Sequence, residues 1–322
     1  MFVNGIASTP KIVLTGVPQG SVLGPLLFLI YINDVRNVVN NVSIRLFADD
    51  TNIFLYNHNC SILIEDTKRV VRNLKTWFDA NKLTLHLGKT NYTIFHSSKR
   101  NHICPDQFEF DNIIIKRTDT TKYLGLIIDH ELSWKQHIGA LCSSLIKYVG
   151  IFYKIRDCIP EDTRLHLYNA FVSSRISYGI EIYGMAKPPI LRPLQIMQNR
   201  ILKILTDKPR RYPTNILYCD LGMLKINEIH REKMFILLYK YSCGKLPEIF
   251  RKVFNPNTHN VQRATRHNQL FTVSRFKTYN GRMLLNNYGR DLWQPLPHFI
   301  KVSTSLYAYK LNIRKYLLSE YY

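Results

Sequence analysis

Two adjacent aspartates near the start of the chain have a residue type and a spacing suited to metal chemistry. Asp49 and Asp50 stand between two short apolar runs, 43–48 and 51–56, whose composition predicts two strands joined at the acids by a tight turn. The like charges of neighbouring carboxylates favour binding of a divalent cation. In a polymerase, metal ions about 4 Å apart activate a hydroxyl and stabilise a leaving pyrophosphate, and carboxylates bridge them. An ordinary turn, in which Asp is common, is the alternative.

A loop rich in glycine and proline precedes the aspartates. Residues 16–25 have the sequence Gly-Val-Pro-Gln-Gly-Ser-Val-Leu-Gly-Pro. Backbone that is exposed at Gly16 and Gly20 and fixed by Pro18 can approach a sugar or a base closely. The Gln19 amide offers both a donor and an acceptor. The alternative is a plain loop that leads into a helix.

The elements that would position these residues combine strands and helices, which predicts an α+β fold. A helix should begin at Ser21 or Gly24, with Pro25 in its first turn. Strand candidates lie at 83–87, 92–96, 113–116 and 123–128. A helix between the two groups presents apolar residues at three- and four-residue spacing, namely Leu63, Val70, Leu74, Trp77 and Phe78. After Asp129 the pattern becomes helical, with a capping box at 133–136 and then a long stripe of Trp134, Ile138, Leu141, Leu145, Tyr148, Phe152 and Ile155.

The charge of the chain is strongly positive and unevenly distributed. It has 44 Lys and Arg against 23 Asp and Glu, a net charge of +21. Residues 200–322 hold 22 basic and 7 acidic side chains, whereas residues 1–199 hold 22 and 16. Such a surplus predicts a polyanionic partner, and the interspersed 20 tyrosines and 16 phenylalanines favour nucleic acid over a membrane surface. A basic tail that only aids solubility is the alternative.

Cysteine usage and hydropathy bear on the compartment. The six cysteines form no CxxC pair and show no metal-ligand spacing with histidine, so we expect reduced thiols in an intracellular protein of the nucleus, the cytoplasm or both. The most apolar run, 22–32, is too short to span a bilayer, and the chain lacks the features of a signal peptide. We therefore expect no membrane partner.

Four motifs in order along the chain resemble the reverse transcriptases of non-LTR (LINE-type) retrotransposons, in particular jockey-like elements. They are the 16–25 loop, Phe-Ala-Asp-Asp at 47–50, Asn-Lys-Leu at 81–83 with Lys-Thr at 89–90, and Tyr-Leu-Gly at 123–125. The first three motifs fall within residues 12–95. A looser match continues to the Trp-Gln-Pro-Leu-Pro segment at 293–297, for which we expect a packing role.

The resemblance implies roles for individual residues. Asp49 would be a ligand of the catalytic metal ions, Mg²⁺ with Mn²⁺ as the alternative, and Asp50 its supporting partner. Lys89 would lie near the departing pyrophosphate, with a solvated lysine in a turn as the alternative. The nucleotide and template pocket would use Gly16, Pro18, Gln19 and Gly20. The hairpin that grips the primer would use Tyr123, Leu124 and Gly125, with a core strand bulged at Gly125 as the alternative.

The resemblance also implies a domain order. Residues 1–130 would be part of a right-hand polymerase palm, an antiparallel sheet with packed helices. Residues 131–212 would form a helical thumb whose polar face follows the duplex, and residues 213–322 a mainly helical basic region. On the thumb we expect 198–200 to lie on the polar face of a helix. The cations that bind phosphates would be Arg200, Lys208, Arg210 and Arg211.

One departure from the family bears directly on activity. The family has a third catalytic aspartate before the glycine-rich loop, in a phrase where Asp precedes Ala-Phe-Asp, and this sequence has no acidic residue before Asp34. We therefore expect a truncated RNA-directed DNA polymerase that is incomplete for catalysis by itself. Its partners would be an RNA template, a DNA primer and deoxynucleotides, and the sequence indicates no obligate protein partner. The alternatives are a non-catalytic nucleic-acid-binding remnant of a mobile element and a hydrolase that uses the aspartates.

Overall fold

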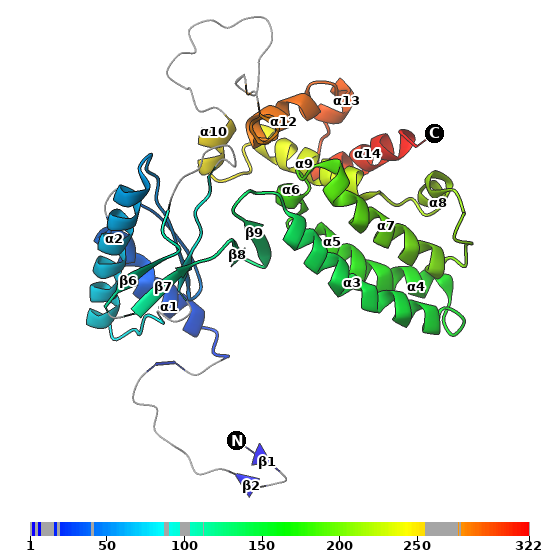
Figure 1. Ribbon diagram of the computed structural model, residues 1–322. Helices are drawn as coiled ribbons and strands as arrows, with labels where there is room; N and C mark the ends of the chain where they lie inside the picture. The colour runs from blue at the N-terminus through cyan, green and yellow to red at the C-terminus, as the bar shows by residue number, and fades with distance from the viewer. Residues whose placement is uncertain are drawn as a thin grey trace, which may run out of the picture. The chain divides into compact units, whose positions relative to one another are not determined.

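The chain divides into two compact units in the computed structural model, Met1–Asp119 and Thr120–Tyr322. The structure describes residues 2–3, 6–7, 16–17, 20–39, 42–86, 90–96, 104–111, 113–254, 276 and 278–321. Helices and strands occur in both units (Figure 1), which confirms the predicted α+β class. Each unit is described by itself below.

The first unit begins with a short antiparallel pair, β1 (Phe2–Val3) with β2 (Ile6–Ala7). The predicted helix follows as α1 (Gly24–Ile32), with Pro25 at its start, where the missing N–H is tolerated. The Ser21 hydroxyl oxygen accepts a hydrogen bond of 3.1 Å from the Gly24 N–H and so satisfies one free donor at the helix start. A 3₁₀ segment, η1 (Asn33–Val38), continues the chain.

The centre of the first unit is α2 (Cys60–Ala80). Val70, Leu74, Trp77 and Phe78 of its predicted apolar stripe are buried, but at the first position Ile64 is buried rather than Leu63. The Asn59 side chain caps its start, because its oxygen accepts from the N–H groups of Ser61 and Ile62. The helix packs against η1 and the hairpin of β3 (Ser43–Phe47) and β4 (Asp50–Phe54). This core contains Ile32, Val35, Val39, Ile44, Val70, Leu74, Trp77 and Phe78.

A three-stranded sheet covers another part of α2 (Figure 1). Its order is β5 (Asn91–Tyr92), β7 (Ile113–Arg117) and β6 (Gln107–Phe110). β6 and β7 are antiparallel, but β5 pairs with β7 in parallel, which departs from the expected all-antiparallel sheet. β7 follows β6 in sequence but lies between β6 and β5, so the two strands of the parallel pair are not consecutive in the chain. Ile64 and Val71 of α2 meet Phe108, Phe110 and Ile115 of the sheet.

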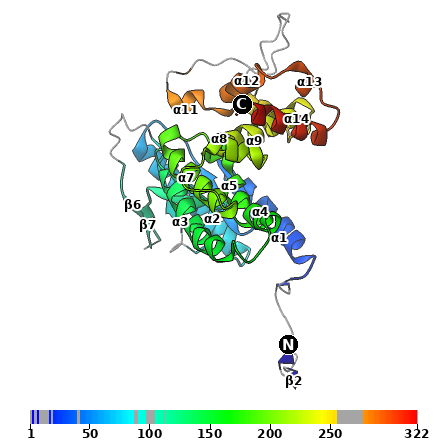
Figure 2. The same ribbon diagram turned by 90° about the vertical axis from the view of Figure 1, so that its right-hand side faces the viewer.

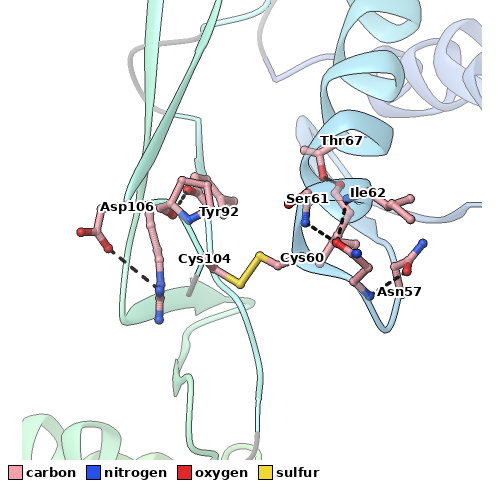
Figure 3. Close-up of a disulfide and its surroundings, with 12 residues drawn as sticks. Asn57, Cys60, Ser61, Ile62, Thr67, Tyr92, Cys104 and Asp106 are labelled. Atoms are coloured by element: carbon pink, nitrogen blue, oxygen red, sulfur yellow. Dashed lines mark hydrogen bonds and ion pairs between the residues drawn. A yellow bond between two sulfur atoms is a disulfide. The ribbon is translucent and has the colours of Figure 1, made fainter. Parts of the chain in front are cut away.

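A disulfide bond between Cys60 and Cys104 corrects the prediction that all six cysteines are reduced. Figure 3 shows that it joins the first residue of α2 to the segment that leads into β6. The two Cα atoms are 5.8 Å apart, within the usual range of disulfides, although 44 positions separate them in sequence. Sequence spacing alone carries no sign of this pairing, because only the packing of α2 on the sheet brings the residues together. Cys142, Cys158, Cys219 and Cys243 are free.

The second unit begins with a hairpin and continues with helices. β8 (Thr120–Tyr123) and β9 (Leu126–Asp129) pair antiparallel. The longest helices are α3 (Lys135–Ile155) and α7 (Pro188–Leu205), which pack side by side (Figure 1). Between them in sequence lie α4 (Glu161–Tyr168), a π-helical turn η3 (Asn169–Ser173), α5 (Ser174–Ser177) and α6 (Ile180–Tyr183).

The core of the second unit follows the predicted apolar stripes. Ile138, Leu145 and Phe152 of α3 and Leu194 and Ile201 of α7 are almost fully buried. Fully burying a side chain of this size contributes about 1.5–3 kcal/mol. By length and composition alone, α3 could cross a membrane. In this structure its buried side chains, such as Ile138 and Leu145, belong to the same core as those of α7.

The start of α3 differs from the predicted capping box. Trp134 is the N-cap residue, in a left-handed conformation with φ of 66°, and its side chain makes no capping hydrogen bond. The Asp129 carboxylate accepts from the N–H groups of Ser133 and Trp134 at 2.8 and 2.7 Å. Burial favours the neutral acid, but these N–H donors outweigh it and lower the pKa of Asp129. The Asp129 carboxylate thus holds the turn before α3, and the Ser133 hydroxyl oxygen accepts from the Lys135 N–H at 3.4 Å.

The C-terminal part of the second unit is helical. α9 (Ile226–Ser242) packs against α12 (Leu285–Trp293) and α14 (Leu306–Ser319), as Figure 2 shows. Leu296 is buried, and Trp293 packs against the same core, so the 293–297 segment has the predicted packing role. The shorter helices are α8 (Thr214–Asp220), α10 (Ile249–Phe254), α11 (Tyr279–Arg282) and α13 (His298–Lys301).

Candidate functional site

The predicted carboxylate pair lies at the tip of the β3–β4 hairpin. Phe47 pairs with Asp50, so the turn consists of Ala48 and Asp49, one residue earlier than predicted. Ala48 takes a left-handed φ of 49°, as two-residue hairpin turns require. Both aspartates are exposed, and consecutive Cα atoms are about 3.8 Å apart. The two carboxylates are thus open to solvent on a tight turn.

The hairpin that carries the pair is held firmly at its base. Ile44 of β3 is buried against α2, and Leu46 and Ile53 pack on the same core. In the described residues, no group of three His, Cys, Asp or Glu side chains is arranged to hold a metal ion. Mg²⁺ does not need such a cage, because it keeps several waters and commonly binds one or two carboxylates together with substrate phosphates. The pair therefore fits an ion that a phosphate-bearing ligand helps to hold.

The glycine-rich loop is described only in part. Gly16 and Gly20 have φ values of +82° and +87°, a conformation that glycine adopts without strain. A Cβ atom at either position would meet nothing within 4 Å, so the backbone conformation rather than close packing requires glycine here. Pro18, Gln19 and Lys89 lie outside the described residues. The predicted roles of these five residues stay predictions.

The Tyr-Leu-Gly motif forms a hairpin rather than a bulged core strand. Tyr123 ends β8, and Leu124 and Gly125 form the turn with φ of 46° and 82°. The Tyr178 hydroxyl donates a 2.6 Å hydrogen bond to the Leu124 carbonyl oxygen. A Cβ atom on Gly125 would lie 3.2 Å from the Tyr178 ring, so this tyrosine packs tightly on the turn. The hairpin expected from the resemblance is present, whereas its contact with a primer is untested.

A basic groove lies between α3 and α7 of the second unit. We call it the α3–α7 groove, and its volume is about 880 Å³. It contains three of the four predicted phosphate-binding cations, Arg200, Lys208 and Arg210, whereas Arg211 is exposed but does not line it. Lys154 and Lys203 complete the set, and sequence analysis missed both. Lys203 lies one helical turn after Arg200 on α7, and this spacing could have revealed it. Lys154 is distant in sequence, and only the packing of α3 on α7 brings it to the cluster.

The cations of the α3–α7 groove are free to meet an external anion. Among the described residues, no acidic side chain forms an ion pair with any of the five. The neighbouring acid, Asp207, is instead held by Arg164 at 2.8 Å and by Arg156 at 3.9 Å. The Lys203 ammonium donates to the Arg210 carbonyl oxygen at 2.7 Å, which ties the loop after α7 to the groove.

One residue of the predicted polar face of α7 is instead buried. Gln198 is 1% exposed, and its amide donates to the Tyr168 hydroxyl at 3.1 Å and to the Leu224 carbonyl oxygen at 3.0 Å. Burial raises the pKa of Tyr168 to about 12, so its hydroxyl stays protonated. Asn199, next in sequence, accepts from the Tyr218 hydroxyl. Gln198 and Asn199 therefore join α7 to its neighbours. Of residues 198–200, only Arg200 has an exposed side chain.

Comparisons with known proteins agree with the motifs. Residues 1–128 match the family described as reverse transcriptase (RNA-dependent DNA polymerase). The chain is 28% identical over 240 residues to an RNA-directed DNA polymerase from mobile element jockey of Drosophila funebris, covering 71% of this chain and 26% of that protein. It is 25% identical over 233 residues to a probable RNA-directed DNA polymerase from transposon X-element of Drosophila melanogaster, covering 70% and 25%. The chain thus spans about a quarter of the length of these relatives. No solved structure matches it.

Proposed function

We propose that this chain, a relative of the reverse transcriptases of non-LTR retrotransposons, is the part of an RNA-directed DNA polymerase that carries two of its metal-binding carboxylates. The observation that carries the proposal is the exposed Asp49-Asp50 pair at the tip of the β3–β4 hairpin, whose base packs against α2. The hairpin lies inside the stretch that matches the reverse transcriptase family. Reverse transcriptases as a family use divalent metal ions. The ion proposed here is Mg²⁺, with Mn²⁺ able to replace it.

The chain's own residues would act by position and charge. Asp49 and Asp50 would hold the ion at the hairpin tip, where solvent exposure leaves room for the phosphates of a deoxynucleotide. When bound, such an ion polarises phosphoryl oxygens and offsets their charge. The core under the hairpin, with Ile44 against α2, keeps the turn from shifting when the ligand binds. Lys89 would donate a proton to the pyrophosphate or screen its charge.

The remaining predicted roles complete this proposal. Residues 16–20 would contact the incoming nucleotide and the RNA template, and the β8–β9 turn at Leu124 and Gly125 would hold the end of the DNA primer. In family terms, residues 1–130 would be palm, residues 131–212 thumb and residues 213–322 a basic region. The five cations of the α3–α7 groove, with Arg211 beside them, would neutralise phosphates in a way that depends on salt but little on sequence.

A non-catalytic nucleic-acid-binding chain is the second candidate function. It is favoured by one specific observation: the five cations of the α3–α7 groove lie in the second unit, outside residues 1–128 that match the reverse transcriptase family. A protein of this kind would retain the binding surface of the second unit without nucleotidyl transfer.

Mn²⁺ binding measured by electron paramagnetic resonance tests the proposed metal site. In the presence of a primed RNA template and a deoxynucleotide, we expect the full chain to bind Mn²⁺ and Asp49→Asn with Asp50→Asn to lose this binding. Glu161 and Asp162 supply a matched control, since they form another adjacent and exposed acidic pair, at the start of α4. Glu161→Gln with Asp162→Asn should bind as the unchanged chain does. Equal loss in both double variants, or in neither, would contradict a specific metal site at the hairpin.

A further inference from the structure

The α3–α7 groove combines two surfaces of different chemistry. Four apolar side chains, Val149 and Tyr153 of α3 with Ile196 and Ile204 of α7, line one part. Tyr153 and Ile196 are 57% and 56% exposed, so a ligand in the groove can contact both side chains. The five cations already named line the same groove. A ligand that matched the groove would need a flat or apolar group and several negative charges close to it.

The aromatic ring in the groove is already oriented by a cation. The guanidinium carbon of Arg156 lies 4.4 Å from the centre of the Tyr153 ring, and Arg156 is itself anchored by Asp157 and Asp207 at 3.4 and 3.9 Å. A ring supported on one face by a guanidinium and largely exposed to solvent can stack with a second flat group. Stacking on aromatic side chains beside a positively charged groove is how proteins bind single strands without sequence preference.

We infer that the α3–α7 groove binds a single-stranded nucleic acid segment, with a base stacked on Tyr153 against the apolar residues and the flanking phosphates on the cations. The inference extends the proposed function, on which it rests for the class of ligand. A volume of about 880 Å³ is in the range of sites for small organic groups, which spans roughly 300–1,000 Å³, so an unstacked base fits. A base within a duplex is paired and stacked on both sides, and therefore cannot present its face to the ring.

Charge distinguishes nucleic acid from other polyanions less clearly than the apolar residues do. Both a single strand and an acidic peptide would satisfy Lys154, Arg200 and Lys208. Only the strand carries a flat aromatic group next to each charge, which matches the exposed Tyr153 ring and Ile196. The structure therefore favours nucleic acid, and the peptide becomes an outcome of the test.

Gly150 offers a way to fill the groove without altering its charge. It lies on α3 between Val149 and Tyr153 and lines the groove, and a Cβ atom there would meet nothing within 4 Å. Leucine is a better helix former than glycine, so Gly150→Leu should fold while its side chain occupies the space of the base. Gly139 supplies the matched control, because it is exposed on the same helix, has equally open surroundings and does not line the groove. It lies eleven residues earlier, about 16 Å along the axis.

The test measures fluorescence anisotropy of a labelled oligothymidylate of about ten nucleotides on the full chain. Buffers contain EDTA, so the result does not depend on metal at Asp49 and Asp50, and a failure of the metal site leaves it unchanged. Gly150→Leu should bind the single strand about fivefold to 150-fold more weakly than the unchanged chain, the range expected for one lost base stack. Gly139→Leu should bind normally. An abasic oligonucleotide of equal length should bind weakly to all three proteins and not distinguish them.

Three results would overturn the inference. Equal affinity of Gly150→Leu and Gly139→Leu for the oligothymidylate would show that the groove takes no base. An equal loss with the abasic strand would reduce the groove to a phosphate contact. If polyglutamate binds more tightly than the oligonucleotide and Gly150→Leu abolishes this binding, the groove would be assigned to an acidic peptide. If Gly150→Leu does not fold, Tyr153→Leu keeps an apolar side chain while removing the ring and should show the same selective loss.

Discussion

The Tyr178 hydroxyl donates a 2.6 Å hydrogen bond to the carbonyl oxygen of Leu124, a residue 54 positions earlier in the chain. The acceptor lies in the turn of the β8–β9 hairpin, where both Leu124 and Gly125 have positive φ. Because a two-stranded hairpin is only marginally stable by itself, this contact with the end of α5 holds the turn in place. The residues proposed to grip the primer are thus positioned by a tyrosine outside their motif.

Replacing Tyr178 with phenylalanine should loosen this turn. The change removes one hydrogen bond and keeps the ring, so the free energy of unfolding should fall by about 1 kcal/mol. Amide hydrogen exchange at 124–126 should accelerate in the variant. Tyr307→Phe is the control, since Tyr307 is 74% exposed and its hydroxyl has no partner among the described residues. Unchanged exchange at the turn in Tyr178→Phe would show that ring packing alone holds it.

Local patterns predicted the helices well because they depend on neighbouring residues. The apolar residues of α2 recur at three- and four-residue spacing, and most of them are buried. The same spacing in α3 predicted residues that are buried in the structure, such as Ile138 and Leu145. The hairpin at Asp49 was also predictable, although its turn begins one residue earlier because Ala48 accepts a left-handed φ.

Features that depend on distant residues were not predictable. Gln198 looks polar and surface-exposed in sequence, but Tyr168 and Leu224 provide partners that make its burial favourable. Lys154 and Arg200 line the same α3–α7 groove, and Cys60 forms a disulfide with Cys104. Both arrangements depend on the packing of elements that are far apart in sequence, which local spacing does not reveal. The roles inferred from the family resemblance rest on the order of the motifs along the chain and stay predictions.

The Cys60–Cys104 disulfide should stabilise the first unit. Closing a loop of this length removes conformational entropy from the unfolded chain worth about 4 kcal/mol in the chain-entropy account. We expect a reducing agent, or Cys60→Ser with Cys104→Ser, to lower the urea midpoint of the first unit. The exposed free cysteines give the control, because Cys158→Ser with Cys243→Ser should not change it. A midpoint insensitive to reductant would contradict a stabilising role.

The second unit should become less stable as the pH falls from about 6.5 to about 4, because His230 stays neutral in the folded chain over this range. Burial lowers the pKa of His230 to about 4, whereas an unfolded histidine titrates near 6.5. Between these values the unfolded chain binds a proton that the folded chain does not, so lowering the pH from 7 to 4.5 should cost roughly 2–3 kcal/mol. His230→Phe preserves the stacking on Tyr288 and should weaken this dependence. Urea unfolding at both pH values checks it, and an equal pH effect in the variant would exclude His230 as the cause.

The apolar surface of α1 should cause self-association. Leu26, Leu29 and Ile30 are 54%, 55% and 67% exposed, a contiguous patch of a kind that monomers rarely leave open. Among the described residues β3 and β4 form a sheet of two strands only, so their outer edges can also pair with another chain. Sedimentation at tens of micromolar should show oligomers.

Introducing charge on α1 should relieve this association. Leu26→Glu with Ile30→Lys also adds a favourable i,i+4 ion pair to the helix. The same kind of change outside this patch, Leu311→Glu on α14, should leave the oligomers in place. If the unchanged chain sediments as a monomer, the apolar patch on α1 does not cause self-association.

Metal-directed cleavage of the backbone tests most directly the claim that Asp49 and Asp50 hold a catalytic divalent ion. Fe²⁺ replaces Mg²⁺ in many oxygen-ligand sites and, with ascorbate and peroxide, cuts the chain beside the place where it binds. With a primed RNA template and a deoxynucleotide present, we expect cuts between residues 47 and 52, located by mass spectrometry. Excess Mg²⁺ and Asp49→Asn should each suppress them. Cuts elsewhere, or cuts at the hairpin that persist in Asp49→Asn, would contradict the account.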